Sequence, residues 1–120
     1  MKTVLIVDDS SSMRVLVSHT LKEAGFAVVE GQDGKDGLDK LTGAPVDLII
    51  TDLNMPVMDG LEMIRRVRQM AKYKFTPILM LTTESQAHKK AEGKTAGATG
   101  WIVKPFNPPQ MLQVIAKVLP

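Results

Sequence analysis

The chain has 120 residues, 44% of them hydrophobic, and its 15 basic and 13 acidic side chains leave a formal net charge of +2. This length predicts one domain over residues 1–120 without an effector domain, and the lack of cysteine excludes disulfides and thiolate chemistry. The longest uninterrupted aliphatic run, residues 4–7, is too short for a signal peptide or a membrane span, so we expect a cytoplasmic protein that does not contact membranes.

Five short aliphatic runs recur along the chain, and most of them lack the apolar/polar alternation of a half-exposed strand. This pattern is typical of strands buried on both faces of a parallel sheet. The runs span residues 4–7, 27–29, 48–50, 78–81 and 101–103.

Between the runs, apolar residues repeat at steps of three and four, which predicts amphipathic helices. These residues are Met13, Leu16, Val17, Leu21 and Ala24, then Leu61, Ile64, Val67 and Ala71, and finally Met111, Ile115 and Val118. Asp59 and Thr83 are each followed three residues later by Glu62 or Gln86, as at helix starts. Gly25, Gly43 and Gly97 stand where helices should stop. The strict alternation predicts an α/β, doubly wound (βα)5 fold with five parallel strands and helices on both faces.

Polar side chains collect directly after the predicted strands, where ligands bind in open parallel sheets. They are Asp8, Asp9, Asp52, Thr82, Thr83 and Lys104, the last of which precedes Pro105. Each has an ordinary structural alternative: Asp9 as N-cap of a helix starting at Ser10, Asp52 as a turn former, Thr82 as a strand-end hydroxyl, and Lys104 as a solvated lysine. Three carboxylates at one edge repel one another unless a cation is present, so the combination favours a functional site.

The chemistry open to these residue types is narrow. Hard oxygen ligands without histidine or cysteine are typical of Mg²⁺. A further carboxylate beside the metal can act as a nucleophile toward phosphorus, while a lysine and a hydroxyl neutralise charge on the phosphoryl oxygens.

Four motifs contain these residues: VLIVDDS (residues 4–10), TDLNMPVMDG (51–60), LTTE (81–84) and VKPF (103–106). In residues and spacing they resemble two-component response-regulator receiver domains from end to end, especially the single-domain chemotaxis regulators of the CheY type. The resemblance implies a flavodoxin-like fold with strand order 2-1-3-4-5. It also implies a signalling protein that is no enzyme beyond catalysing its own phosphorylation and slow dephosphorylation.

The resemblance further implies a role for each matching residue. Asp52 would accept a phosphoryl group from a CheA-like sensor histidine kinase, and Asp8, Asp9, Asp52 and the backbone carbonyl of Asn54 would hold Mg²⁺. Thr82, Thr83 and Lys104 would contact the phosphoryl group, Trp101 would be the switch aromatic, and Lys104-Pro105 would be a cis peptide bond. A monomer would present a target-binding face on its fourth helix, fifth strand and fifth helix.

The sequence departs from the family pattern in two ways. Trp101 is bulkier than the usual tyrosine or phenylalanine, and Lys89, Lys90, Gly93 and Lys94 stand where many relatives have an apolar stripe. Gly93 in a helix interior, together with the small apolar content of residues 84–96, predicts that this helix is the least stable of the domain.

The sequence is less consistent with two other functions. An aspartate-nucleophile phosphohydrolase would use the same carboxylates but would have an acid at position 54, and a transcription factor would need an effector domain. A phosphate sink without an effector stays open as a form of the signalling function. The basic run Arg65, Arg66, Arg68, Lys72 and Lys74 is interpreted as a solvated face, and no nucleic-acid partner is expected.

Overall fold

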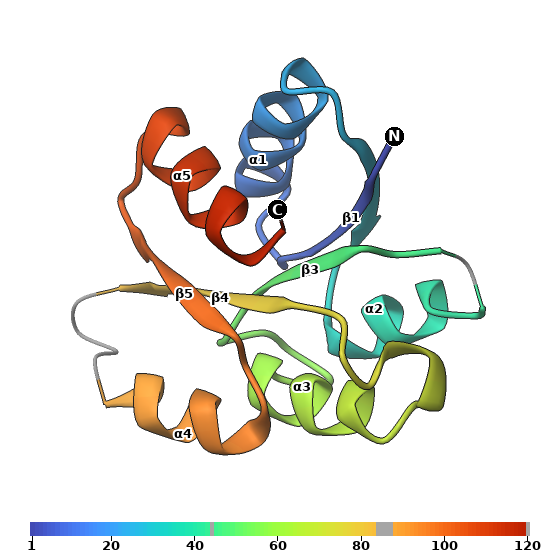
Figure 1. Cartoon of the computed structure of the whole chain (residues 1–120). Helices are drawn as coiled ribbons and strands as arrows, with labels where there is room; N and C mark the ends of the chain where they lie inside the picture. Colours follow the sequence, from blue (N-terminus) through green and yellow to red (C-terminus); the bar gives the residue numbers. More distant parts are fainter. Residues whose placement is uncertain (44, 84–87, 120) are drawn as a thin grey trace.

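Five parallel strands form one sheet in the order β2-β1-β3-β4-β5 (Figure 1). The strands are β1 (Thr3–Val7), β2 (Ala27–Gly31), β3 (Leu48–Asp52), β4 (Ile78–Thr83) and β5 (Gly100–Lys104). The computed structural model describes residues 1–43, 45–83 and 88–119. Both the predicted doubly wound fold and the strand order 2-1-3-4-5 are confirmed.

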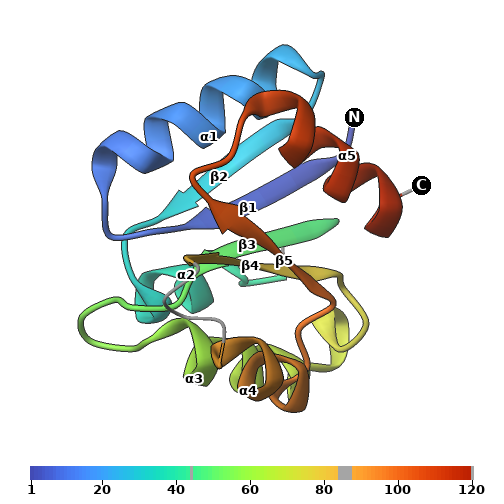
Figure 2. The same ribbon diagram turned by 90° about the vertical axis from the view of Figure 1, so that its left-hand side faces the viewer.

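Helices cover the sheet on both sides (Figure 2). On one face lie α1 (Ser11–Glu23) and α5 (Pro108–Val118). The opposite face is covered by α2 (Gly34–Lys40), α3 (Gly60–Arg68) and α4 (Lys89–Ala96), with a short 3-10 turn, η1 (Ala71–Tyr73), after α3. None of the helices in the described ranges is long and apolar enough to cross a membrane.

The inner strand β1 shows why the sequence has uninterrupted apolar runs. In β1, Val4 and Ile6 pack with α1 and α5, whereas Leu5 and Val7 pack with α2 and α3, and all four are fully buried. Side chains alternate between the two faces of a strand, so a strand with helices on both sides needs apolar residues at every position.

The helix starts follow from capping side chains. Ser10 accepts from the backbone N–H of Met13 at 3.3 Å, and Asp59 accepts from that of Glu62 at 2.8 Å. Ser10 is therefore the N-cap of α1, and the alternative that assigned this role to Asp9 is wrong. Asn107 and Gln110 form a reciprocal capping box at the start of α5, which the sequence analysis did not predict.

Several predicted details need correction. Leu16 is 46% exposed, because α1 directs Val17 and Leu21 rather than Leu16 toward the sheet. Ala71 lies in η1 and is exposed, since α3 ends at Arg68. Gly25 and Gly97 follow their helices with φ of +95° and +117°, as predicted, but Gly43 lies three residues beyond the end of α2. Thr83, predicted to cap a helix, is the last residue of β4, and the rest of that predicted helix start, through Gln86, lies outside the described residues.

Gly93 has a packing role that its sequence position does not reveal. It is the buried residue of α4, and a Cβ at this position would lie 2.1 Å from the sulfur of Met80 on β4. The glycine therefore lets α4 approach the sheet, in addition to lowering the intrinsic stability of the helix.

Candidate functional site

The carboxyl ends of the strands bring the predicted polar residues to one edge of the sheet. Asp52 is the last residue of β3 and pairs in register with Leu81, directly before Thr82 on β4. Lys104 ends β5 beside Thr83, and Asp8 and Asp9 follow β1. Parallel strands in register end together, so residues more than 90 positions apart in the sequence become neighbours.

Three carboxylates meet at this edge. One carboxylate oxygen from each of Asp8, Asp9 and Asp52 lies within 4.8 Å of the others. Asp8 is fully buried, Asp52 is nearly so, and Asp9 is exposed. The Lys104 ammonium lies 3.3 Å from Oδ1 of Asp52 and 3.8 Å from Oδ2 of Asp8. Among the described residues, the Lys104 ammonium thus contacts two of the three carboxylates of the cluster.

Backbone N–H groups orient two of these acids. Ser10 N–H donates to Oδ1 of Asp8 at 2.9 Å, and Leu53 N–H donates to Oδ1 of Asp52 at 2.8 Å. Oδ1 of Asp52 also receives the Lys104 contact. Both of these contacts are therefore made to the same carboxylate oxygen of Asp52.

Two buried polar atoms at this edge have no hydrogen-bond partner in the described residues: Oδ2 of Asp8 and Oγ1 of Thr82. Burial raises the pKa of the Asp8 carboxyl, and the negative charges of Asp52 and Asp9 raise it further, against the lowering effects of the Ser10 N–H and of Lys104. Buried polar groups normally form hydrogen bonds, so both atoms are able to take a further partner. A cation could bind at Oδ2 of Asp8, and an oxygen-rich anion could accept a hydrogen bond from Oγ1 of Thr82.

The donor set is suited to a divalent cation. The cluster consists of carboxylate oxygens, and it is compact enough for a single ion. One of these acids, Asp8, has a buried oxygen without a hydrogen bond in the described residues. Mg²⁺ takes one or two carboxylates, keeps several waters and prefers hard oxygen ligands. The residues present therefore fit Mg²⁺.

A close backbone approach holds the loop after β3 against the site. A Cβ at Gly60 would lie 2.1 Å from the Asp52 carbonyl oxygen, and Gly60 N–H donates to the Leu53 carbonyl at 2.9 Å. Only glycine permits this contact. The side chain of Asn54 is exposed on the same loop, and the Lys104-Pro105 peptide bond is cis, as predicted.

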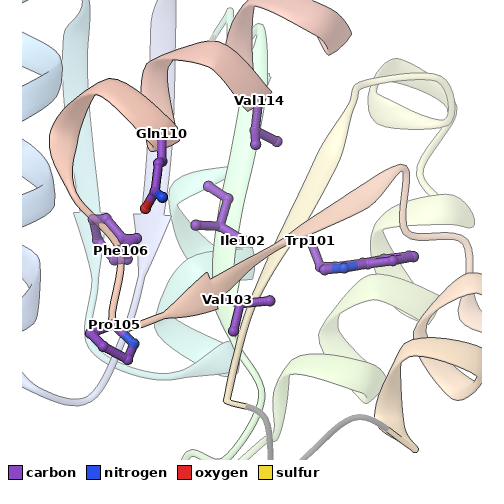
Figure 3. A pocket seen from close by; sticks show the side chains of 7 residues that line it. All are labelled: Trp101, Ile102, Val103, Pro105, Phe106, Gln110 and Val114. Carbon is purple, nitrogen blue, oxygen red and sulfur yellow. The ribbon is translucent and has the colours of Figure 1, made fainter.

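Trp101 is not part of the acidic cluster. Its ring is 40% exposed, and the Lys90 ammonium of α4 lies 5.1 Å from the ring centroid. A hollow of about 310 Å³ lies between β5 and α5, and Figure 3 shows the Trp101 ring pointing away from Phe106 and Gln110 at its other side. Its lining residues are Trp101, Ile102, Val103, Pro105, Phe106, Gln110 and Val114.

The interpretation of the basic run as a solvated face is wrong for Arg68. Its guanidinium donates to the carbonyl of Gly97 at 2.9 Å and to the carbonyls of Tyr73, Lys74 and Thr76 at 2.6–3.2 Å. Burial lowers the pKa of Arg68. Arg65 and Arg66, by contrast, are exposed and pair with Glu62. The run thus contains a structural arginine that joins the end of α4 to the segment after α3.

Arg14 is a site-adjacent residue that sequence analysis did not identify. Its Nη1 donates to the Asp8 carbonyl, and its Nε lies 3.4 Å from Oε1 of Glu30. Its position in the sequence could have indicated this role. Arg14 follows Ser10, the N-cap of α1, by about one helical turn, so its long side chain can reach back to the end of β1.

Comparison with known proteins agrees with this geometry. Residues 4–116 match the response regulator receiver domain family. The chain is 38% identical to the chemotaxis protein CheY1 of Helicobacter pylori, over 97% of this chain and 95% of that protein. It is 41% identical to a chemotaxis protein CheY homolog of Campylobacter jejuni, over 97% and 91% of the two chains. The solved structure of the chemotaxis response regulator CheY4 of Vibrio cholerae is 55% identical, with 99% of each chain covered and a TM-score of 0.94.

Proposed function

This chain belongs to the response regulator receiver family, which makes it a phosphorylation-activated signalling switch, and we propose that Asp52 is its phosphoacceptor. The observation that supports this most directly is the grouping of Asp52 with two further acids and Lys104 at one sheet edge. The alternative of a phosphohydrolase is not favoured, because position 54 is asparagine where such enzymes have a second acid.

In the proposed reaction, Oδ2 of Asp52 attacks the phosphorus of a phosphohistidine on a sensor histidine kinase. The new O–P bond forms as the P–N bond breaks, and the electron pair leaves with the donor imidazole. Asp8, Asp9, Asp52 and the backbone carbonyl of Asn54 would hold Mg²⁺, which when bound neutralises charge on the phosphoryl oxygens. The chain's own chemistry is confined to this transfer and to the later hydrolysis of the aspartyl phosphate.

Three residues are suited to contact the phosphoryl group once it is on Asp52. Lys104 already lies 3.3 Å from Asp52 and can pair with a phosphoryl oxygen. The unpaired hydroxyl of Thr82 is a donor that lacks an acceptor in the described residues, and a phosphoryl oxygen would provide one. Thr83 lies beside Lys104 in register and would contribute a further contact.

The relatives named for chemotaxis support a CheA-like kinase as donor and a chemotaxis-type output, or a role as phosphate sink. We assign target binding to the face formed by α4, β5 and α5, which includes the hollow beside Trp101 (Figure 3). Trp101 would then report the switch, since its ring lies on this face rather than at the acidic cluster.

The decisive experiment is phosphorylation by acetyl phosphate with Mg²⁺, followed by intact mass. Wild type should gain one phosphoryl group, and Asp52→Asn should gain none, because it lacks the nucleophile. Asp39→Asn is the matched control: it removes an exposed acid of α2 and should be phosphorylated like wild type. Equal incorporation in wild type and Asp52→Asn would refute the assignment.

A second experiment tests the cation site. Millimolar Mg²⁺ should raise the melting temperature of wild type, because a ligand bound only to the native state stabilises it by mass action. An Asp9→Ala/Asp52→Ala double variant should lose most of this shift. A shift of the same size in both proteins would argue against the site.

A further inference from the structure

We infer that Arg14 is a positioning residue for the acidic site, aligning Asp8 and Asp9 for Mg²⁺ through the peptide bond between them. This inference rests on the proposed function. It starts from the location of Arg14 on α1, where the side chain is 18% exposed and turned back toward the end of β1.

The backbone of Asp8 is held at both ends. Its N–H donates to the Gly31 carbonyl of β2 at 3.1 Å, and its carbonyl accepts from Nη1 of Arg14. This carbonyl belongs to the peptide group that joins Asp8 to Asp9. A rotation of that group would change the directions of both carboxylates, so the Arg14 contact restrains two of the three acids together.

Glu30 holds the arginine in turn. Nε of Arg14 lies 3.4 Å from Oε1 of Glu30, which is next to Gly31 on β2. The planar guanidinium thus uses one edge for the end of β1 and another for β2. A lysine has no such fork and can serve only one partner well.

The contacts of Arg14 would act against electrostatic repulsion among the three carboxylates. Asp8 is fully buried, its Oδ2 has no hydrogen bond in the described residues, and the nearby charges of Asp52 and Asp9 repel it. Without a fixed peptide group, the carboxylates would relax apart, and a cation would have to bring them together again. Partners that orient metal ligands in this way change metal affinity even though they do not touch the metal.

Charge and positioning make opposite predictions for Arg14. Removing its positive charge near an anionic cluster would by itself strengthen Mg²⁺ binding, since like charges repel. Removing its hold on Asp8 would weaken binding. The sign of the change in Mg²⁺ affinity therefore separates the two effects.

The experiment is isothermal titration of Mg²⁺ into wild type, Arg14→Met and Arg14→Lys, with folding checked by circular dichroism. We expect Arg14→Met to bind Mg²⁺ about tenfold more weakly, the lower end of the range for residues that orient metal ligands. Arg14→Lys should fall between it and wild type. Arg65→Met is the control, because it removes an exposed arginine of α3 that pairs with Glu62, and it should match wild type.

Equal or tighter Mg²⁺ binding by folded Arg14→Met would overturn the inference. If Arg14→Met does not fold, Arg14→Lys decides: weaker binding than wild type supports the inference, and equal binding overturns it. Failure of the proposed function looks different, because wild type would then not bind Mg²⁺ or Asp52→Asn would still be phosphorylated.

Discussion

Two neighbouring helices on the same face of the sheet, α3 and α4, are attached in different ways (Figure 1). In its nine residues α3 buries Gly60, Leu61, Met63, Ile64 and Val67, and Asp59 caps its start. Of the eight residues of α4, the buried one is Gly93. Most helical stability in proteins comes from a packed apolar face, so α3 is anchored along its length and α4 is not.

Discrete contacts hold α4 instead. Its end is tied by Arg68 to the Gly97 carbonyl, its middle approaches Met80 through Gly93, and Lys90 covers the Trp101 ring. Segments that move are drawn from the less stable parts of a domain, and α4 lies next to β4, which carries Thr82. From this comparison we expect α4 to be the element that responds to phosphorylation.

The largest effect should follow from opening a cavity under α3. Ile64 is fully buried, and Ile64→Ala should lower the free energy of unfolding by about 2–5 kcal/mol, through lost burial and an unfilled cavity. The exposed Thr95 of α4 is the site for comparison. Thr95→Ala should change the free energy of unfolding by less than about 0.5 kcal/mol. Urea unfolding measures both; similar losses would mean that the two helices are anchored alike.

Removing the Arg68 side chain, which links α3 to the end of α4, should lower the free energy of unfolding by a smaller amount. Arg68→Met should lower the free energy of unfolding by about 1–3 kcal/mol, because part-buried carbonyls lose a charged donor. Hydrogen exchange should rise in α4 more than in α3. Arg65→Met, which removes an exposed ion pair, should be nearly neutral. Equal exchange in α4 before and after the Arg68 change would show that this arginine does not hold the helix.

Gly93→Ala should destabilise the protein, although alanine is the better helix former. The new Cβ would lie 2.1 Å from the sulfur of Met80, which is fully buried and has to move. Overpacking of this kind should cost about 1–2 kcal/mol in urea unfolding. Met80→Ala should be less harmful in the Gly93→Ala background than in wild type. A more stable Gly93→Ala protein would mean that Met80 repacks freely.

The N-cap of α3 should contribute about 1 kcal/mol to the free energy of unfolding. Asp59 accepts from the Glu62 N–H at 2.8 Å, and Asp59→Ala removes this acceptor. Thermal unfolding should detect the loss, and exchange in α4 should stay unchanged because the cap lies on the other helix. Faster exchange in α4 would show that the two helices open together.

The smallest effect concerns the response of α4 to a phosphoryl mimic. With beryllofluoride and Mg²⁺, exchange over residues 89–96 should slow about threefold to tenfold, as a marginal helix gains contacts. Exchange over α3 should not change. Protection of α4 that already equals that of α3, and that beryllofluoride leaves unchanged, would contradict its role as the responsive element.

Much of the fold could be predicted from the sequence, because burial on both faces leaves a continuous apolar run at β1, and helical spacing marks the helices between the strands. Asp8, Asp52, Thr82 and Lys104 could be placed at one edge for a related reason: parallel strands end at the same side of a sheet. These are local patterns joined by one topological rule.

The roles of Gly93, Arg68 and Arg14 were decided by the tertiary structure. Gly93 is unfavourable in an isolated helix and becomes necessary only where Met80 approaches it. Arg68 has the sequence context of a solvated arginine, and its acceptors on Gly97 and the segment before β4 become neighbours only on folding. Arg14 likewise contacts the Asp8 carbonyl, just after β1, and Glu30 on β2, which become neighbours only on folding. Sequence patterns report which side chains a strand or helix buries, whereas contacts between elements depend on distances that exist only once the chain has packed.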